Sequence, residues 1–325
     1  MRVLVTGANG LLGHHVVFEL LKKHDVHVIV RSTRNIHFDA HYVTVFEGNF
    51  ANIGTLKNAA KGCEAIIHIA AVTATDLLHY EDYSKINVDA SAQIISVAND
   101  LNINKLVFVS TANTIGFGTE NMLANETSAI QFPFSKSFYA QSKVEAERLF
   151  IEASLLPDRH VIIINPSFLI GAYDIKPSSG KLMLMGYKKA LMFAPRGGKN
   201  FVAATDVATA ICNALTMGKN GHRYLASGVN LTFIEFYKLQ KQVGNYKQLL
   251  IGIPDSLLIL IGFVGDSLRK AGIKTEVCSM NLRQLIVKEN FSNSKAASEL
   301  LMPQTELKTA IIEALNWFQK IGKIR

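Results

Sequence analysis

The stretch Thr6-Gly7-Ala8-Asn9-Gly10-Leu11-Leu12-Gly13 decides the fold of this chain. It follows an apolar run at residues 3–5 that is typical of a buried strand, and it leads into residues 12–23, where apolar positions recur at helical spacing. Glycines between a strand and a helix make the tight turn, let the backbone approach a pyrophosphate and let the helix pack close to the strand. Free N–H groups at the helix N-terminus would bind the phosphates. The stretch therefore predicts a dinucleotide-binding loop.

The composition indicates a globular protein with a sizeable core. The chain has 325 residues, 49% of them hydrophobic, which suits one large or two modest domains. Its net charge of +8 comes from scattered lysines and arginines with no basic run interleaved with aromatics, which disfavours nucleic-acid binding. Cys63, Cys212 and Cys278 have neither paired spacing nor companion histidines, so we expect no disulfide framework and no metal site. With a strand-like start in place of a signal segment, we expect a cytoplasmic protein.

The most apolar window is residues 257–264, bounded by Asp255 and Asp266. It is far shorter than the roughly 20 residues that a membrane-spanning helix needs. We expect a helix buried against the core. The alternative is a peripheral contact with a membrane surface.

Short Val/Ile/Leu-rich runs alternate with helical patterns through the first half of the chain. After the first strand they lie at residues 26–31, 42–46, 65–69, 106–110 and 161–165. Because these runs are almost continuously apolar, they predict a parallel sheet covered by helices on both faces, an α/β fold of the doubly wound Rossmann type. We expect residues 1–166, with parts of 200–227, to form this dinucleotide-binding domain. Residues 167–325 would mainly form a smaller substrate-binding cap intertwined with it.

The end of the second strand bears on the choice of cofactor. An NAD-preferring site places an acidic residue there for the ribose 2′-hydroxyl, whereas this chain has Arg31, with Arg34 three residues later. A guanidinium offers a charge and a fork of donors that suit a phosphate. The pattern predicts NADP(H) in preference to NAD(H), although a solvated loop arginine is the alternative, above all for Arg34.

Other strand ends supply candidate cofactor contacts, because ligands of open α/β sheets bind at the carboxyl ends of the strands. Asn49 and Phe50 follow the third strand, and Asn49 could hydrogen-bond an adenine edge. Ile69, Ala70 and Ala71 end the fourth strand, where small side chains would let a dinucleotide lie close. His68 has no carboxylate or nucleophile near it in the sequence, so we interpret it as a structural histidine.

A tyrosine and a lysine four residues apart, Tyr139 and Lys143, lie on one face of a predicted helix that opens near Ser137. The preceding strand ends in Ser110-Thr111. The same spacing recurs at Tyr237 and Lys241, which we interpret as part of a helix at the solvent edge because no Ser/Thr-tipped strand precedes it.

Together the glycine loop, Ser110-Thr111, Tyr139 with Lys143, and Asn165-Pro166-Ser167 resemble the extended short-chain dehydrogenase/reductase family. The likeness covers nearly the whole chain. Within the NAD-dependent epimerase/dehydratase superfamily it is greatest to the dihydroflavonol-4-reductase-like branch, alongside 3β-hydroxysteroid dehydrogenases and nucleotide-sugar epimerases.

The resemblance implies roles for the matching residues. Tyr139 would donate a proton to a carbonyl oxygen as hydride arrives from the nicotinamide, and Thr111 would orient that oxygen. Lys143 would lower the pKa of Tyr139 and hold the nicotinamide ribose. The expected cofactor-binding set is Thr6, Gly7, Asn9, Gly10, Leu11, Leu12, Gly13, Arg31, Arg34, Asn49, Phe50, Ile69, Ala70, Ala71, Asn87, Ser110, Tyr139, Lys143, Pro166 and Ser167.

Departures from the family narrow the expected reaction. Ala112 and Asn113 stand where sugar-nucleotide dehydratases of the family have acidic residues, so no carboxylate drives an elimination. Arg31 disfavours an epimerase that keeps NAD tightly bound. We expect an NADP(H)-dependent oxidoreductase that reduces a ketone or aldehyde on a fairly hydrophobic small molecule. A nucleotide-sugar epimerase and a non-catalytic dinucleotide sensor are the alternatives.

The substrate side is less sharply marked. Thr73, Thr75, Ala112 and Phe168 are candidate substrate contacts near strand ends. The Met-rich residues 181–193 would be either an adaptable lid or an ordinary packing helix. By resemblance, the chain could form a homodimer through the helices at residues 80–99 and 139–153.

Overall fold

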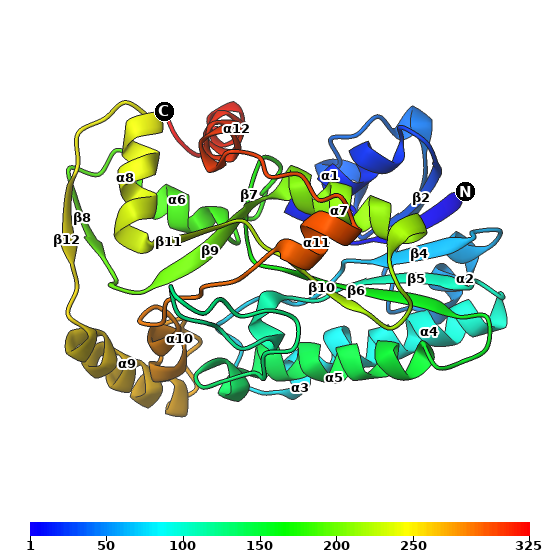
Figure 1. The fold of residues 1–325 in the computed structure, drawn as a ribbon, viewed down its shortest axis with the longest axis horizontal. Helices are drawn as coiled ribbons and strands as arrows, with labels where there is room; N and C mark the ends of the chain where they lie inside the picture. The colour runs from blue at the N-terminus through cyan, green and yellow to red at the C-terminus, as the bar shows by residue number, and fades with distance from the viewer.

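A parallel sheet of seven strands forms the centre of the protein, as Figure 1 shows. The computed structural model describes residues 1–325 and all of their side chains except that of Asn35. The strand order is β10-β6-β5-β4-β1-β2-β3. The strands are β1 (Arg2–Thr6), β2 (Asp25–Val30), β3 (Val43–Glu47), β4 (Ala65–His68), β5 (Lys105–Val109), β6 (His160–Pro166) and β10 (Arg223–Ala226).

Helices cover both faces of this sheet, which explains why its strands are apolar on both sides. One face packs on α1 (Leu11–Leu20) and α7 (Ala204–Met217), and the other packs on α2 (Ile53–Ala60), α4 (Ala90–Asp100) and α5 (Phe138–Ala153). The short helix α3 (Glu81–Ser84) leads through a wider turn into α4. The predicted α/β, doubly wound Rossmann fold is therefore confirmed, and each predicted strand lies within one or two residues of the observed bounds.

A second group of elements follows β6 and packs around its own apolar cluster. It contains a three-stranded sheet, β11-β9-β7, and a two-stranded parallel ribbon, β12-β8. Its elements are β7 (Phe168–Ile170), α6 (Gly180–Gly186), β8 (Leu191–Ala194), β9 (Gly198–Ala203), β11 (Val229–Thr232), α8 (Phe233–Val243), β12 (Leu249–Gly252), α9 (Asp255–Lys270), α10 (Ser279–Gln284) and α12 (Leu307–Lys320). The helix α11 (Ser294–Glu299) packs instead beside β10 of the large sheet. The division into a dinucleotide-binding domain and a substrate cap stays a prediction.

The strand order reverses beside β1. The chain passes from β1 outward through β2 and β3, then returns to the other side of β1 with β4. Open α/β sheets bind their ligands at such a switch point, outside the carboxyl ends of the strands. The glycine loop after β1 and the residues that follow β4 and β5 therefore share one edge of the sheet.

Two expectations about later helices are wrong. Residues 257–264 do form a helix within α9, but Leu257, Leu260 and Val264 face solvent. Tyr237 is fully buried in α8 and donates to the carbonyl oxygen of Leu182, so this helix does not turn its tyrosine to the solvent edge. Among the described residues, no helix has both the length and the apolarity to cross a membrane.

The Met-rich segment is a packing helix over part of its length. The side chain of Met183 in α6 is completely buried in the cap core, while Met185 is exposed. This favours the packing alternative over a lid.

Candidate active site

The glycine loop is as tightly packed as its sequence suggests. Gly7 has φ +76°, and a Cβ there would lie 2.7 Å from the backbone nitrogen of Ala70. A Cβ on Gly13 would lie 2.1 Å from the Gly7 carbonyl oxygen, so α1 could not start so close to β1 with any larger residue. The Gly10 N–H donates to the Gly7 carbonyl at 3.1 Å, which closes the turn before α1 begins at Leu11.

Leu11 and Leu12 are buried on α1, whereas Asn9 is half-buried and Gly10 exposed. The apolar pair anchors the helix, and its first turn stays open at the edge of the sheet. This is the arrangement in which N–H groups at a helix N-terminus receive a phosphate.

Two buried polar side chains lie at the adjacent strand ends. The Nδ1 atom of His68 is 2.7 Å from the hydroxyl of Thr6, and burial lowers the pKa of His68 to about 3, so the ring is neutral and structural. The hydroxyl of Ser110 at the end of β5 is buried and has no hydrogen-bond partner among the described residues. An orphaned donor and a cradle that admits only glycine fit a dinucleotide whose polar groups complete the site.

Asn87 acts on the loop after β4. Its amide donates to the Val72 carbonyl at 3.1 Å and to the Ser142 hydroxyl at 2.9 Å, and it accepts from the Val72 N–H at 2.8 Å. Because the side chain is buried and bonded to protein on both sides, it holds the loop containing Ala70 and Ala71 beside Gly7.

The residues expected at the adenosine end of the cofactor are on the surface. Arg31 and Arg34 are exposed after β2, and Ser32 accepts a hydrogen bond from the Arg34 backbone N–H at 3.3 Å. Asn49 is exposed and accepts from the Ala51 N–H, a turn contact that leaves its side-chain NH₂ group outward. Both arginines therefore have room to meet a phosphate.

Tyr139 and Thr111 lie close together at the carboxyl end of the parallel sheet. A hydrogen bond joins their hydroxyl groups, and Thr111 also accepts from the Asn113 N–H at 3.2 Å. Burial raises the pKa of Tyr139 to about 12, with the Thr111 hydrogen bond acting in the opposite direction. The phenol is therefore protonated at neutral pH, which is the form that a proton donor needs.

The structure places Lys143 under the end of β5. Its amine is fully buried, donates to the Val109 carbonyl at 2.8 Å and lies 4.1 Å from the ring centre of Phe108. Burial lowers its pKa to about 7, and the nearby Glu147 carboxylate acts to raise it. The pKa of Tyr139 is set by burial and by the Thr111 hydrogen bond, so the lowering by Lys143 stays a prediction.

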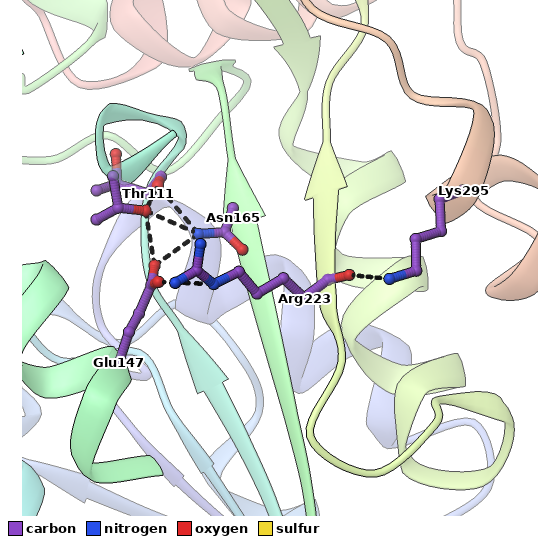
Figure 2. A network of polar contacts seen from close by, with 6 residues as sticks. Thr111, Glu147, Asn165, Arg223 and Lys295 are labelled. Atoms are coloured by element: carbon purple, nitrogen blue, oxygen red, sulfur yellow. Dashed lines mark hydrogen bonds and ion pairs between the residues drawn. The ribbon is translucent and has the colours of Figure 1, made fainter. Parts of the chain in front are cut away.

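A buried polar network that the sequence reasoning missed supports the turn at Thr111 (Figure 2). One oxygen of Glu147 accepts from the Thr114 hydroxyl and the Asn165 amide, both at 2.7 Å. The other oxygen lies 3.1 Å from Nε of Arg223 on β10. Asn165 also donates to the Thr111 carbonyl at 3.2 Å. The network ties α5, β6 and β10 to the turn that presents Thr111.

The carboxylate of Glu147 could have been suspected from its place four residues after Lys143, on the same helical face. Arg223 gave no such signal, because it comes from a strand 76 residues later in the chain. Its own backbone carbonyl accepts from Lys295 at 2.7 Å, which attaches α11 to the network (Figure 2).

The candidate substrate residues are more dispersed than the proton-donor group. Thr73 and Thr75 are exposed, Ala112 is buried beneath the Thr111 turn, and Phe168 is half-buried with its ring centre 5.5 Å from that of Phe201. Ser167 donates to Asn200 at 2.6 Å, so its hydroxyl is engaged with the cap sheet. Thr73, Thr75 and Ala112 follow β4 and β5, at the carboxyl edge of the large sheet where α5 with Tyr139 also begins.

The chain is similar to known proteins both in sequence and in structure. The model of the NAD dependent epimerase/dehydratase family matches residues 3–226, and the chain belongs to this family. A protein from Synechocystis sp. named "Putative dihydroflavonol 4-reductase" is 27% identical, over 99% of this chain and 95% of its own length. The 4-hydroxy-2-methyl-3-oxo-4-farnesyl-3,4-dihydroquinoline-1-oxide ketoreductase of Stigmatella aurantiaca is 25% identical, over 83% of this chain and 81% of its own.

The fold is shared with enzymes of different chemistry. The UDP-glucose 4-epimerase of Thermus thermophilus in complex with NAD superposes with a TM-score of 0.77 at 18% identity, covering 98% of this chain and 99% of that one. This likeness shows the fold alone. The family relatives make the protein an enzyme of the NAD(P)-dependent reductase/dehydrogenase type that uses a nicotinamide dinucleotide.

Proposed function

We propose that this member of the NAD dependent epimerase/dehydratase family is an NADP(H)-dependent reductase of a ketone or aldehyde on a fairly hydrophobic small molecule. The observation that carries the proposal is a protonated Tyr139 phenol, hydrogen-bonded to Thr111, at the carboxyl end of the sheet. The two relatives whose names include a reductase activity support the same class of reaction.

The proposed chemistry first needs the chain to bind the cofactor. Gly7, Gly10 and Gly13 would hold the pyrophosphate, and the free Ser110 hydroxyl would bind the cofactor near β5. When bound, the nicotinamide supplies the hydride for the reduction.

Tyr139 would donate its phenolic proton to the substrate oxygen, and Thr111 would hold that oxygen in place. Lys143 sits under this site with a pKa of about 7, so it can change its charge near neutrality and replace the lost phenolic proton. The polar network around Glu147 fixes the position of the Thr111 turn relative to Lys143.

The preference for NADP(H) rests on Arg31. It is exposed just after β2, where the 2′ position of an adenosine ribose would lie in this fold. A guanidinium there gains a charge-assisted hydrogen bond from a phosphate but little from a hydroxyl.

The experiment is a panel of steroid-like, flavonoid-like and small aliphatic carbonyl compounds mixed with purified protein and either NADPH or NADH. We expect NADPH oxidation with the more hydrophobic compounds and about a ten-fold or greater preference for NADPH. Arg31→Ser should weaken NADPH use selectively, and Lys23→Ser, an exposed cation just after α1, is the control.

Three results would contradict the proposal. They are the absence of NADPH oxidation with any compound, tighter binding of NADH than NADPH by calorimetry, and NAD that co-purifies with a protein stabilised by UDP-sugars. The last result would assign the chain to the nucleotide-sugar epimerases. The homodimer expected through α4 and α5 is likewise a proposal, which light scattering of the purified protein tests.

A further inference from the structure

The helix α9 exposes most of its large apolar side chains to solvent. Its exposed stripe consists of large apolar side chains, each between 40% and 61% exposed, and recurs at the helical spacing of one face: Leu257, Leu260, Ile261, Val264 and Leu268. The side that faces the protein carries the buried Leu258, two glycines and two charged residues. Most of the large apolar side chains of this helix are therefore not buried in its own chain.

Close backbone contact fixes the inner side. A Cβ on Gly262 would lie 2.6 Å from Cα of Ser279, and one on Gly265 would lie 1.8 Å from the Val277 carbonyl oxygen. Asp266 accepts from the Ser279 N–H at 2.9 Å. Apart from Leu258, the inner face is therefore specified by small and polar residues, and the apolar stripe is directed outward by the same contacts.

The neighbouring ribbon also exposes large apolar side chains. Its strands β8 and β12 pair in parallel, with Leu191 opposite Leu249 and Phe193 opposite Ile251. All four are exposed, so they share the outer face of the ribbon, while the alternate residues pack into the cap core. Ribbon and helix lie at the same end of the molecule, joined by the two residues between β12 and α9 (Figure 1).

Exposed cations border this surface. They lie within a few residues of the ribbon strands or at and after the end of the helix: Lys189, Arg196, Lys247, Lys270 and Lys274. None of the five takes part in an ion pair with a described carboxylate. From residue 244 to 275 the chain contains two carboxylates, Asp255 and Asp266, and neither is fully exposed.

We propose that the α9 stripe and the outer face of the β8–β12 ribbon dock on an anionic lipid bilayer, with the apolar side chains in the interface and the five cations among the headgroups. An apolar face rimmed by lysine and arginine is the chemistry of peripheral membrane helices. A second copy of this chain fits less well, because a twofold contact would place the same unpaired cations against one another.

The surface also adjoins the candidate active site. Arg269 of α9 donates to the Leu77 carbonyl, and Asn281 of α10 donates to the Thr75 carbonyl at 2.9 Å. Both acceptors belong to the loop that follows β4. Docking would thus hold the substrate side of the site next to a bilayer, the source of a lipophilic substrate; this consequence alone rests on the proposed function.

The test is flotation of the full-length protein with vesicles of phosphatidylcholine, with or without phosphatidylglycerol, in the absence of substrate. We expect binding to the anionic vesicles that is weakened by salt. Leu260→Gln with Val264→Gln should lower the partition at least about ten-fold. Lys270→Gln with Lys274→Gln should lower it about twenty-fold on anionic vesicles only.

The control is Leu155→Gln with Leu156→Gln, two exposed leucines just after α5, which should leave binding unchanged. Absence of wild-type binding, equal binding to both kinds of vesicle, or insensitivity to the α9 substitutions would overturn the proposal. So would a dimer in solution that Leu260→Gln with Val264→Gln dissociates, since a second copy would then be the occupant. Because no turnover is measured, these outcomes are independent of the reductase activity.

Discussion

Two helices of this protein carry the same pair of residues at the same spacing, Tyr139 with Lys143 on α5 and Tyr237 with Lys241 on α8. On α5 the tyrosine is half-buried at the mouth of the sheet and hydrogen-bonded to Thr111. On α8 the tyrosine is fully buried and donates to the Leu182 carbonyl at 3.1 Å, inside the cap core.

The lysines differ as well. Lys143 is buried and its pKa is lowered to about 7, whereas Lys241 is half-buried and donates to the Gln248 carbonyl at 3.1 Å. The place of each helix in the fold therefore decides whether its tyrosine and lysine can take part in a reaction. The helix α5 follows β5 at the carboxyl edge of the large parallel sheet, where a cofactor and a substrate can both reach its side chains, whereas α8 follows β11 of the three-stranded sheet.

The largest expected difference between the pairs is in the proton donors. Tyr139→Phe should lower kcat/KM for carbonyl reduction about 10²- to 10⁴-fold, because it removes the general acid. Tyr237→Phe should leave kcat/KM within about two-fold, because its hydroxyl bonds only within the cap. Steady-state NADPH oxidation measures both, and equal losses in the two variants would refute the distinction.

The lysines should differ in their effect on turnover. Lys143→Met should lower kcat/KM for carbonyl reduction about 10- to 100-fold near pH 7, because Tyr139 loses the group that replaces its proton. Lys241→Met should leave it unchanged.

The same lysine should affect stability. The unfolded chain keeps a lysine charged up to about 10.5, whereas folded Lys143 loses its proton near 7, so the unfolded state binds more protons between these values. Stability should therefore rise with pH across that window, and Lys143→Met should remove this part of the slope. A slope that persists in the variant would show that Lys143 is not the group responsible.

A smaller effect should come from Glu147. Its carboxylate favours the charged form of Lys143, so Glu147→Gln should lower the pKa of that lysine and move the falling limb of the kcat/KM profile to lower pH. We expect a loss of about a few-fold near pH 7. Glu152→Gln, on the exposed side of the same helix, is the control, and a profile that scales down without moving would mean that Glu147 acts only on stability.

The smallest expected effect is on the stability of the protein and concerns Tyr237 of α8. Tyr237→Phe should lower the free energy of unfolding by about 1 kcal/mol, because the Leu182 carbonyl loses its buried donor. Urea denaturation measures the change. A stable Tyr237→Phe protein with impaired turnover would contradict the structural role given to this residue.

The sequence was sufficient to predict the large sheet, because its strands are continuous apolar runs between a loop and a helix. Strand ends also predicted the glycine loop and Thr111 as site residues, and helical spacing predicted Tyr139 with Lys143. It did not reveal where the amine of Lys143 points, because that depends on the burial under Val109 that the packed fold imposes.

Later parts of the chain show what apolar content alone leaves open. Counting the hydrophobic residues of 257–264 predicted a buried helix, but the inner face is selected by close backbone contacts at Gly262 and Gly265. The partnership of Glu147 with Arg223 depends on β10 lying beside β6, which is a long-range pairing. Neither is encoded in local spacing.

The most direct test of the central claim follows the hydride itself. NADPH carrying deuterium at its transferable position is incubated with an accepted carbonyl compound, and the alcohol is analysed by mass spectrometry for wild type, Tyr139→Phe and Tyr237→Phe. We predict one deuterium per alcohol from wild type and Tyr237→Phe at similar rates, and product formation at least about 100-fold slower with Tyr139→Phe. Unlabelled alcohol, or equal rates for the two tyrosine variants, would contradict the assignment of the active site to α5.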